Sequence, residues 1–210
     1  MFPPDQYALI DFGQGRRLER IAGMVLDRPC PTAENLPKHD PAAWSAADAR
    51  FERGNAESGH WHCRGELPER WTLPHHRFVF ELKRAPFGHV GLFPEQAENW
   101  NWLEQICTKP GATGSASASA SADETSGATG SASAGTGPPS NDRLRILNLF
   151  AYTGGSTLAV ALGGAEVTHV DAAKNVVAWA RRNAELSGLA DAPIRWIADD
   201  AVKFCKRELR

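Results

Sequence analysis

The chain has 210 residues, of which 42% are hydrophobic, and a formal net charge of -2 at pH 7. This length suits one hydrophobic core with a small annex, and the weakly acidic charge gives no support to nucleic-acid binding on electrostatic grounds. No apolar run approaches the roughly 18 residues of a membrane-spanning helix, and the N-terminus lacks the basic start and apolar core of a signal peptide. We therefore expect a cytoplasmic protein.

Cysteine and histidine spacing argues against a metal centre. The four cysteines lie far apart without a Cys-x-x-Cys pair, so neither a zinc ribbon nor a disulfide framework is indicated. His60-Trp61-His62-Cys63 and His75-His76 have no further ligand group at a recognisable spacing. We expect reduced thiols and no bound metal. The four cysteines are Cys30, Cys63, Cys107 and Cys205.

Residues 1–85 are predicted to form a small β-rich N-terminal region. Short strand-like runs alternate there with glycine-containing turns, which suits an antiparallel meander. Prolines and a polar run around Arg53–Gly59 indicate loops between the later runs. The predicted strands are Tyr7–Phe12, Arg17–Ile21, Met24–Leu26, Trp71–Leu73 and Arg77–Leu82.

Residues 86–107 and 108–142 have different compositions. Gln96–Ile106 has helical character, with Trp100, Leu103 and Ile106 at spacings of three, a pattern more typical of a core face than of a base-stacking surface. Residues 108–142 consist almost wholly of Gly, Ala, Ser, Thr and Pro, and one octapeptide occurs at both 111 and 127. This composition predicts a disordered linker that forms an expanded surface loop.

Residues 143–210 carry the most informative pattern, which predicts an α/β nucleotide-binding unit. The apolar run from Ile146 ends in a turn with Gly154-Gly155, a helix-like Leu158–Leu162 follows, and a second strand, Glu166–Asp171, ends in a carboxylate. The two glycines allow a sharp turn and let a ligand lie against the main chain. Parallel strands bind ligands at their carboxyl ends, so Asp171 is predicted to hold ribose hydroxyls.

The type of nucleotide is narrowed by two missing motifs. Neither the Gly-Lys-Ser/Thr ending of a phosphate loop nor Gly-x-Gly-x-x-Gly occurs, which disfavours ATP and NAD and favours an adenosine cofactor without phosphates. S-adenosylmethionine is the common one. Ile194–Asp200 is predicted to be a third strand ending in Asp199 and Asp200, one of which caps the following helix. Asp171 could likewise be the N-cap of a helix over Ala172–Ser187.

Several segments together resemble class I S-adenosylmethionine-dependent methyltransferases, the family that includes the large-subunit ribosomal RNA cytosine carbon-5 methyltransferases. Upstream, Phe87–Trp100 resembles the family segment written around Gly-x-Phe-x-Asp-Gln-Arg, although Glu95-Gln96-Ala97 replaces its last three residues. The resemblance covers roughly residues 70–107 and 143–210. The downstream segments that carry it are Asn148–Gly155, Val170–Lys174, Ala180–Asn183 and Asp199–Phe204.

The resemblance implies a Rossmann-like sheet, S-adenosylmethionine as cofactor and ribosomal RNA as partner. Gln96 matches the family and is carried over, whereas Ala97 puts in doubt any contact of the absent arginine. Phe150 and Tyr152 stand where other methyltransferases have glycines, and are predicted to wall the pocket. The predicted cofactor-binding residues are Gln96, Asn148, Phe150, Tyr152, Gly154, Gly155, Asp171, Asp199 and Asp200.

The family's substrate-facing Asp-Pro-Pro motif is not found before Arg210. We therefore expect a fragment that holds the cofactor half of the fold and exposes an apolar sheet edge. Methylation at carbon 5 of a pyrimidine requires covalent addition at the neighbouring ring position, but no cysteine stands in a context that marks the nucleophile. Two alternatives stay open: methyl transfer to a protein or small molecule, and a non-catalytic cofactor-binding module.

Overall fold

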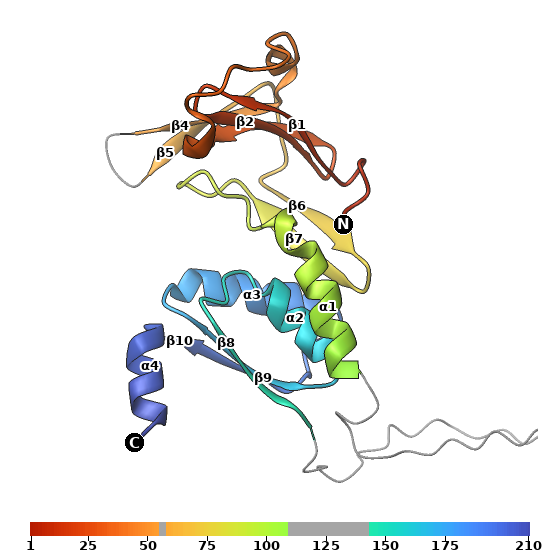
Figure 1. Cartoon of the computed structure of the whole chain (residues 1–210), viewed down its shortest axis with the longest axis vertical. Helices are drawn as coiled ribbons and strands as arrows, with labels where there is room; N and C mark the ends of the chain where they lie inside the picture. Colours follow the sequence, from red (N-terminus) through yellow and green to blue (C-terminus); the bar gives the residue numbers. More distant parts are fainter. Residues whose placement is uncertain (55–57, 109–142) are drawn as a thin grey trace, which may run out of the picture.

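The computed structural model describes residues 1–54, 58–108 and 143–210, so nearly all of the predicted linker lies outside the described residues. Within these ranges the strands form three sheets, stacked from the N-terminal sheet to the C-terminal one (Figure 1). The first sheet has the order β1-β2-β3-β4-β5, antiparallel except for the β3–β4 pair. Its strands are β1 (Tyr7–Gly13), β2 (Arg16–Ile21), β3 (Met24–Pro29), β4 (Ala49–Arg53) and β5 (Gly59–Cys63). Between β3 and β4 lie two 3-10 turns, η1 (Pro31–Ala33) and η2 (Ala43–Ala46).

A β-hairpin and a helix form the middle layer. Strands β6 (Arg70–His75) and β7 (Phe78–Lys83) pair antiparallel across a two-residue turn. Alternate residues of β7, namely Phe78, Phe80 and Leu82, are buried, as the period of a strand requires. After the 3-10 turn η3 (Pro94–Gln96), helix α1 (Ala97–Thr108) inserts Trp100 among these side chains.

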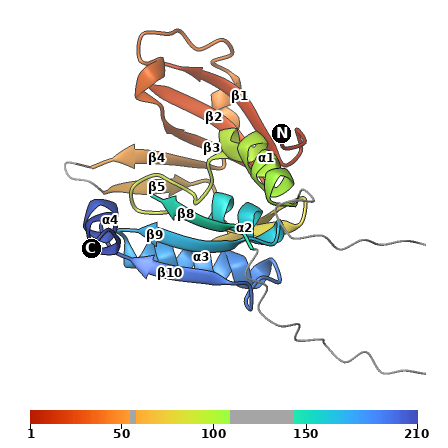
Figure 2. The same ribbon diagram turned by 60° about the horizontal axis from the view of Figure 1, so that its bottom comes forward.

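The C-terminal layer is a parallel sheet with the order β10-β9-β8. Strands and helices alternate, and Figures 1 and 2 show α2 and α3 on the same face of the sheet. This arrangement confirms the predicted Rossmann-like α/β fold. Its elements are β8 (Arg145–Leu149), α2 (Gly155–Leu162), β9 (Glu166–Asp171), α3 (Lys174–Leu186), β10 (Ile194–Ala198) and α4 (Ala201–Glu208).

Side chains of α3 join the hairpin to the parallel sheet. The backbone N–H of Glu81 donates to Asn183 Oδ1 at 2.8 Å, and Trp179 Nε1 donates to the carbonyl of Glu81 at 2.8 Å. The N–H of Val79 donates to Ser187 Oγ at 2.9 Å. Because strand β7 is buried on this side, these bonds satisfy main-chain groups that would otherwise be buried without a hydrogen-bond partner. The hairpin and α3 therefore form one packed unit.

The structure differs from the sequence prediction in three places. Strands β4 and β5 were not predicted, because Phe51 and Trp61 are the only large apolar side chains in their pairing, beside the small Ala49 and Cys63. Helix α2 begins three residues before the predicted Leu158. Helix α3 begins at Lys174 with Ala173 as its N-cap, so the alternative role of Asp171 as the N-cap of this helix is not observed.

Among the described residues, no helix combines the length and apolarity needed to cross a membrane. The division of the chain into domains stays a prediction.

Candidate functional site

A cavity of about 450 Å³ lies where the carboxyl end of β8 meets the segment before α1. The loop from β8 to α2 forms one wall, and Trp100 of α1 contributes to the other. Five of the nine predicted site residues line it: Gln96, Asn148, Phe150, Tyr152 and Gly155. The structure thus brings together two segments that the resemblance had linked only by motif.

The wall formed by the β8–α2 loop has an unusual backbone. Phe150 has φ 54° and Tyr152 has φ 49°, both in the left-handed region that non-glycine residues rarely adopt. Gly154 follows with φ 94° and is the N-cap of α2. The alternation turns the chain sharply after β8 and places both aromatic residues in the cavity lining.

Asp171, at the end of β9, fixes this loop. One carboxylate oxygen accepts from the N–H of Tyr152 at 3.0 Å, and the other accepts from the N–H of Ala173 at 3.0 Å. The N–H of Ala151 also donates to the carbonyl of Val170 at 3.0 Å. Asp171 stands behind the loop and does not itself line the cavity. Each of its oxygens can accept a second hydrogen bond.

The two glycines allow close packing as well as turning. A Cβ on Gly155 would lie 2.5 Å from the Trp100 ring, and a Cβ on Gly154 would lie 3.2 Å from the Ala180 side chain. The N-terminus of α2 therefore approaches α1 and α3 at a distance that only glycine permits. From the sequence, the two glycines were predicted to allow a sharp turn and the approach of a ligand, but this packing of helices was not predicted.

Tyr152 and Phe150 have different environments. The Tyr152 ring packs 4.8 Å from the Phe93 ring, and its hydroxyl is buried without a hydrogen-bond partner among the described residues. Burial raises the pKa of this hydroxyl to about 12, so it is a neutral donor at pH 7. Phe150 is 77% exposed although it is a large apolar side chain. An exposed aromatic ring and an unsatisfied hydroxyl at one cavity are features of a ligand site.

Three of the predicted residues already form hydrogen bonds or ion pairs within the protein. Asp200 is the N-cap of α4 and accepts from the N–H of Lys203 at 2.9 Å. Asp199 pairs with Arg207 at 2.8 Å, which lowers the pKa of its carboxyl. Gln96 Oε1 accepts from Asn99 Nδ2 at 2.8 Å. Neither Asp199 nor Asp200 lines the cavity, and their part in cofactor binding stays a prediction.

Sequence reasoning missed several residues of the lining. Trp100 was interpreted as core, and with 4% exposure it is core, yet one part of it also borders the cavity. Glu95 was noted only as a departure from the family motif, but its position brings a carboxylate to the lining. The missed residues are Phe80, Gly91, Leu92, Phe93, Glu95, Trp100, Leu149, Ala151, Thr153 and Ser156.

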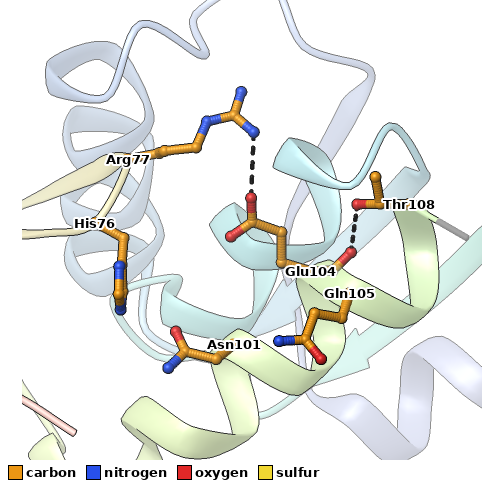
Figure 3. A pocket seen from close by; sticks show the side chains of 6 residues that line it. All are labelled: His76, Arg77, Asn101, Glu104, Gln105 and Thr108. Carbon is orange, nitrogen blue, oxygen red and sulfur yellow. Dashed lines mark hydrogen bonds and ion pairs between the residues drawn. The ribbon is translucent and has the colours of Figure 1, made fainter.

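A larger hollow, of about 680 Å³, lies elsewhere, between the β6–β7 turn and α1 (Figure 3). Its polar side chains bind one another: Arg77 pairs with Glu104 at 3.2 Å, and Thr108 Oγ1 donates to the carbonyl of Glu104 at 2.6 Å. It contains none of the predicted site residues. In the described ranges, no group of three or more His, Cys, Asp or Glu side chains is placed to hold a metal ion.

A parallel sheet with this loop and an acidic residue ending the next strand forms a Rossmann-like methyltransferase fold. The chain is similar in sequence and structure to S-adenosylmethionine-dependent methyltransferases. A solved S-adenosylmethionine-dependent methyltransferase from Agrobacterium tumefaciens is 36% identical with a TM-score of 0.74, covering 97% of this chain and 55% of its own. The chain thus spans about half the length of that relative.

Two curated relatives match a shorter stretch. Ribosomal RNA large subunit methyltransferase K/L of Shewanella baltica is 40% identical over 63 residues, which are 30% of this chain and 9% of the relative. Ribosomal RNA large subunit methyltransferase I of Klebsiella pneumoniae is 38% identical over 64 residues, or 30% and 16% of the two chains. No family model matches the sequence.

Proposed function

We propose that the chain binds S-adenosylmethionine in the cavity at the end of β8 and serves to methylate RNA, with carbon 5 of a cytosine in ribosomal RNA as the target. The observation that carries this proposal is the β8–α2 loop, in which Phe150 and Tyr152 have left-handed backbone conformations. The loop lines the cavity, and Asp171 at the end of the neighbouring strand fixes it through a hydrogen bond. The names of the two curated relatives support ribosomal RNA as the substrate.

The cavity fits an adenosine cofactor without phosphates. Its volume of about 450 Å³ lies within the roughly 300 to 1,000 Å³ usual for small-molecule sites. Its lining offers the exposed Phe150 ring for an aromatic base and the Tyr152 hydroxyl as a donor. The Asp171 carboxylate does not line the cavity, but it retains acceptor capacity for the ribose diol of a cofactor that extends past the β8–α2 loop toward β9. Among the described residues that line the cavity, none is a lysine or arginine that could neutralise a phosphate.

The cofactor supplies an electrophilic methyl group on a sulfonium, and the chain's own residues supply binding and orientation. Holding two reactants in line removes much of the entropic barrier to transfer. Attack from carbon 5 of cytosine also needs a thiolate that adds at the adjacent ring carbon. None of the four cysteines lines the described cavity, and burial of Cys107 raises its pKa, which disfavours the thiolate. The catalytic nucleophile is therefore not assigned.

The cofactor proposal is tested by titration calorimetry of the 210-residue chain with S-adenosylhomocysteine. We expect binding at micromolar concentration. Asp171→Ala should weaken it by roughly 10- to 100-fold, because a charge-assisted hydrogen bond to the ribose and the support of the loop are both lost. Asp171→Asn keeps one oxygen that can accept hydrogen bonds and should weaken S-adenosylhomocysteine binding less than Asp171→Ala does. The exposed Asp191 between α3 and β10 gives the control Asp191→Ala, with unchanged affinity.

Unchanged affinity of a folded Asp171→Ala variant would show that Asp171 does not contribute to the site. A folded 210-residue chain that does not bind S-adenosylhomocysteine would contradict the proposed cofactor. The substrate is tested separately, by transfer of labelled methyl groups to ribosomal RNA and to a protein fraction. Label in the protein fraction alone would contradict RNA as the substrate.

A further inference from the structure

The segment between β7 and η3, residues 84–93, carries aromatic side chains that the fold leaves exposed. It lies between the N-terminal sheet and the parallel sheet (Figure 1). The carbonyl of Pro86 accepts from the N–H of Gly59 on β5 at 2.7 Å, and the carbonyl of Gly91 accepts from Thr153 Oγ1 at 2.8 Å. The segment is therefore anchored to both layers.

Buried and exposed side chains alternate along this segment. Val90 is 0% exposed and Leu92 is 4% exposed, so both belong to the core. Phe87 and Phe93 are each 37% exposed, and His89 between them is exposed as well. The ring centroids lie 5.3 Å apart from Phe87 to His89 and 5.9 Å apart from His89 to Phe93. These three residues form a continuous aromatic row on the surface.

The aromatic row leads to the cavity. Phe93 lines the cavity and packs on Tyr152, which lines it too. Phe87 and His89 do not line it, so the row extends beyond the cavity over the surface. Single exposed apolar side chains are ordinary in folded proteins. A contiguous row of them beside a ligand site is instead typical of an interaction surface.

The charges close to the aromatic row are positive. Within the described residues, the charged groups that act on His89 are Arg28, Arg17 and Arg53, and no carboxylate is among them. Arg28 is buried against Glu19, whereas Arg53 is exposed and Arg17 is partly exposed. Partial burial lowers the pKa of His89, and the three arginines lower it further, so the ring is neutral at pH 7.

Neutral rings beside accessible arginines favour a polyanion with aromatic bases. Unpaired bases stack on such rings, and arginines neutralise the phosphates between them. A protein segment could also cover exposed rings, but it would gain less from a surface whose nearby charges all have the same sign. The combination therefore favours single-stranded nucleic acid.

We propose that Phe87, His89 and Phe93 form a stacking surface for the unpaired RNA bases next to the nucleotide that enters the cavity. Arg17 and Arg53 lie on the side from which they contact the phosphates. This inference rests on the proposed function, and it assigns the part of the molecule that holds the RNA. It requires a single strand, because the bases of a duplex are stacked on one another.

The test measures binding of a fluorescently labelled single-stranded RNA of about 12 nucleotides to the 210-residue chain. Fluorescence anisotropy is recorded at about 50 mM salt, where phosphate contacts are strong. Phe87→Ala and His89→Ala should each weaken binding about 10-fold, because one stacking contact is lost. His89→Phe keeps an aromatic ring and should stay within about 2-fold of the unsubstituted chain. Titration with S-adenosylhomocysteine should give the same affinity in each of these variants, because neither position lines the cavity.

Two controls accompany these variants. Trp102 of α1 is 58% exposed and lies on the side of the helix opposite Trp100, which borders the cavity. Trp102→Ala should leave RNA binding unchanged, and a loss equal to that of Phe87→Ala would overturn the inference. A duplex of the same sequence should bind at least about 10-fold more weakly than the single strand. Equal binding of the duplex would overturn the inference as well.

Unchanged RNA affinity in folded Phe87→Ala and His89→Ala would overturn the stacking surface, while RNA would stand as the proposed substrate. A chain that binds S-adenosylhomocysteine but no single-stranded RNA would overturn the stacking surface and leave the proposed cofactor. Circular dichroism establishes that each variant is folded. If neither alanine variant folds, photocrosslinking of a 4-thiouridine-labelled RNA to the unsubstituted chain decides. A crosslink within residues 84–93 supports the inference, and crosslinks only elsewhere contradict it.

Discussion

Two aromatic residues of the cavity are held in a conformation that disfavours them. Left-handed backbone costs a non-glycine residue roughly 1–2 kcal/mol, and Phe150 and Tyr152 both adopt it. Phe150 gains little in return from the fold, since 77% of it is exposed. Strain that the fold does not compensate is typical of residues kept for a ligand.

Replacement of Phe150 by asparagine tests this interpretation. Asparagine tolerates the left-handed region, so Phe150→Asn should raise the free energy of unfolding by up to about 1 kcal/mol, equivalent to a rise in Tm of about 2–4 °C. Calorimetric scans measure it. Tyr152→Asn has the same backbone conformation but loses the packing on Phe93, and it should lower Tm. A lower Tm for Phe150→Asn would show that the exposed ring does stabilise the fold.

For single residues, the sequence predicted which residues lie near the cavity better than it predicted their contacts. Asp171 was predicted from its position after a strand, and it does lie at the carboxyl end of β9. Its two bonds to the N–H groups of Tyr152 and Ala173 were not predictable, because they depend on the left-handed loop.

The elements around the site are held together by close approach of backbone to aromatic rings. Gly91, in the segment between β7 and η3, has φ 90°, and a Cβ there would lie 2.1 Å from the Trp179 ring of α3. Trp179 is 4% exposed and donates to β7, so the ring cannot withdraw without breaking that bond. The glycine therefore sets how closely this segment approaches α3.

A matched pair of glycines separates packing from backbone strain. Gly164 has φ 89°, almost the same as Gly91, but a Cβ there meets nothing within 4 Å. Gly164→Ala should cost only the strain, about 1–2 kcal/mol. Gly91→Ala should cost about 1–3 kcal/mol more, through overpacking. Denaturant unfolding measures both, and equal losses would mean that Trp179 moves aside freely.

The elements of the parallel layer could be predicted because each has a strong local period, and because Gly163 ends α2 and Asp200 caps α4. Strands β4 and β5 could not, because their pairing depends on Phe51 meeting Trp61, ten residues later in the chain. The hairpin β6–β7 was predicted as strand-like, but its attachment to α3 was not. That attachment joins residues about 100 positions apart, which no local pattern records.

The molecule as a whole contains two buried histidines whose protonation opposes folding. His75 is 2% exposed among the rings of Phe2, Phe78 and Trp100, and burial, assisted by the neighbouring His76, lowers its pKa to about 4. Burial does the same for His169. Both side chains are neutral in the folded state at pH 5, whereas in the unfolded chain they titrate near the ordinary value of about 6.5.

These lowered histidine pKa values make the free energy of unfolding fall as the pH falls. Above about pH 6.5 neither state binds these protons, and stability is at its full value. Between about pH 6.5 and 4 the unfolded chain binds protons that the folded chain does not, so stability falls as pH falls, by at most about 1.4 kcal/mol per pH unit for each histidine. We expect the free energy of unfolding to be lower at pH 5 than at pH 7. The pKa of His89 is also lowered by burial, so His75→Phe, which keeps an aromatic ring in the cluster, should reduce the slope without abolishing it. An unaltered slope would exclude His75 as a source.

The attachment of the hairpin to α3 has a consequence for the order of events during synthesis. The acceptor of the Glu81 N–H, Asn183, is synthesised 102 residues after it. Trp179, which donates to the Glu81 carbonyl, is synthesised 98 residues after Glu81. At a translation rate of roughly 5–20 residues per second, β7 leaves the ribosome about 5–20 seconds before its partners exist. During that interval an apolar strand carrying Phe78, Phe80 and Leu82 has neither α3 nor the parallel sheet to cover it. The distance along the chain between β7 and α3 therefore determines how long this strand stays uncovered during synthesis.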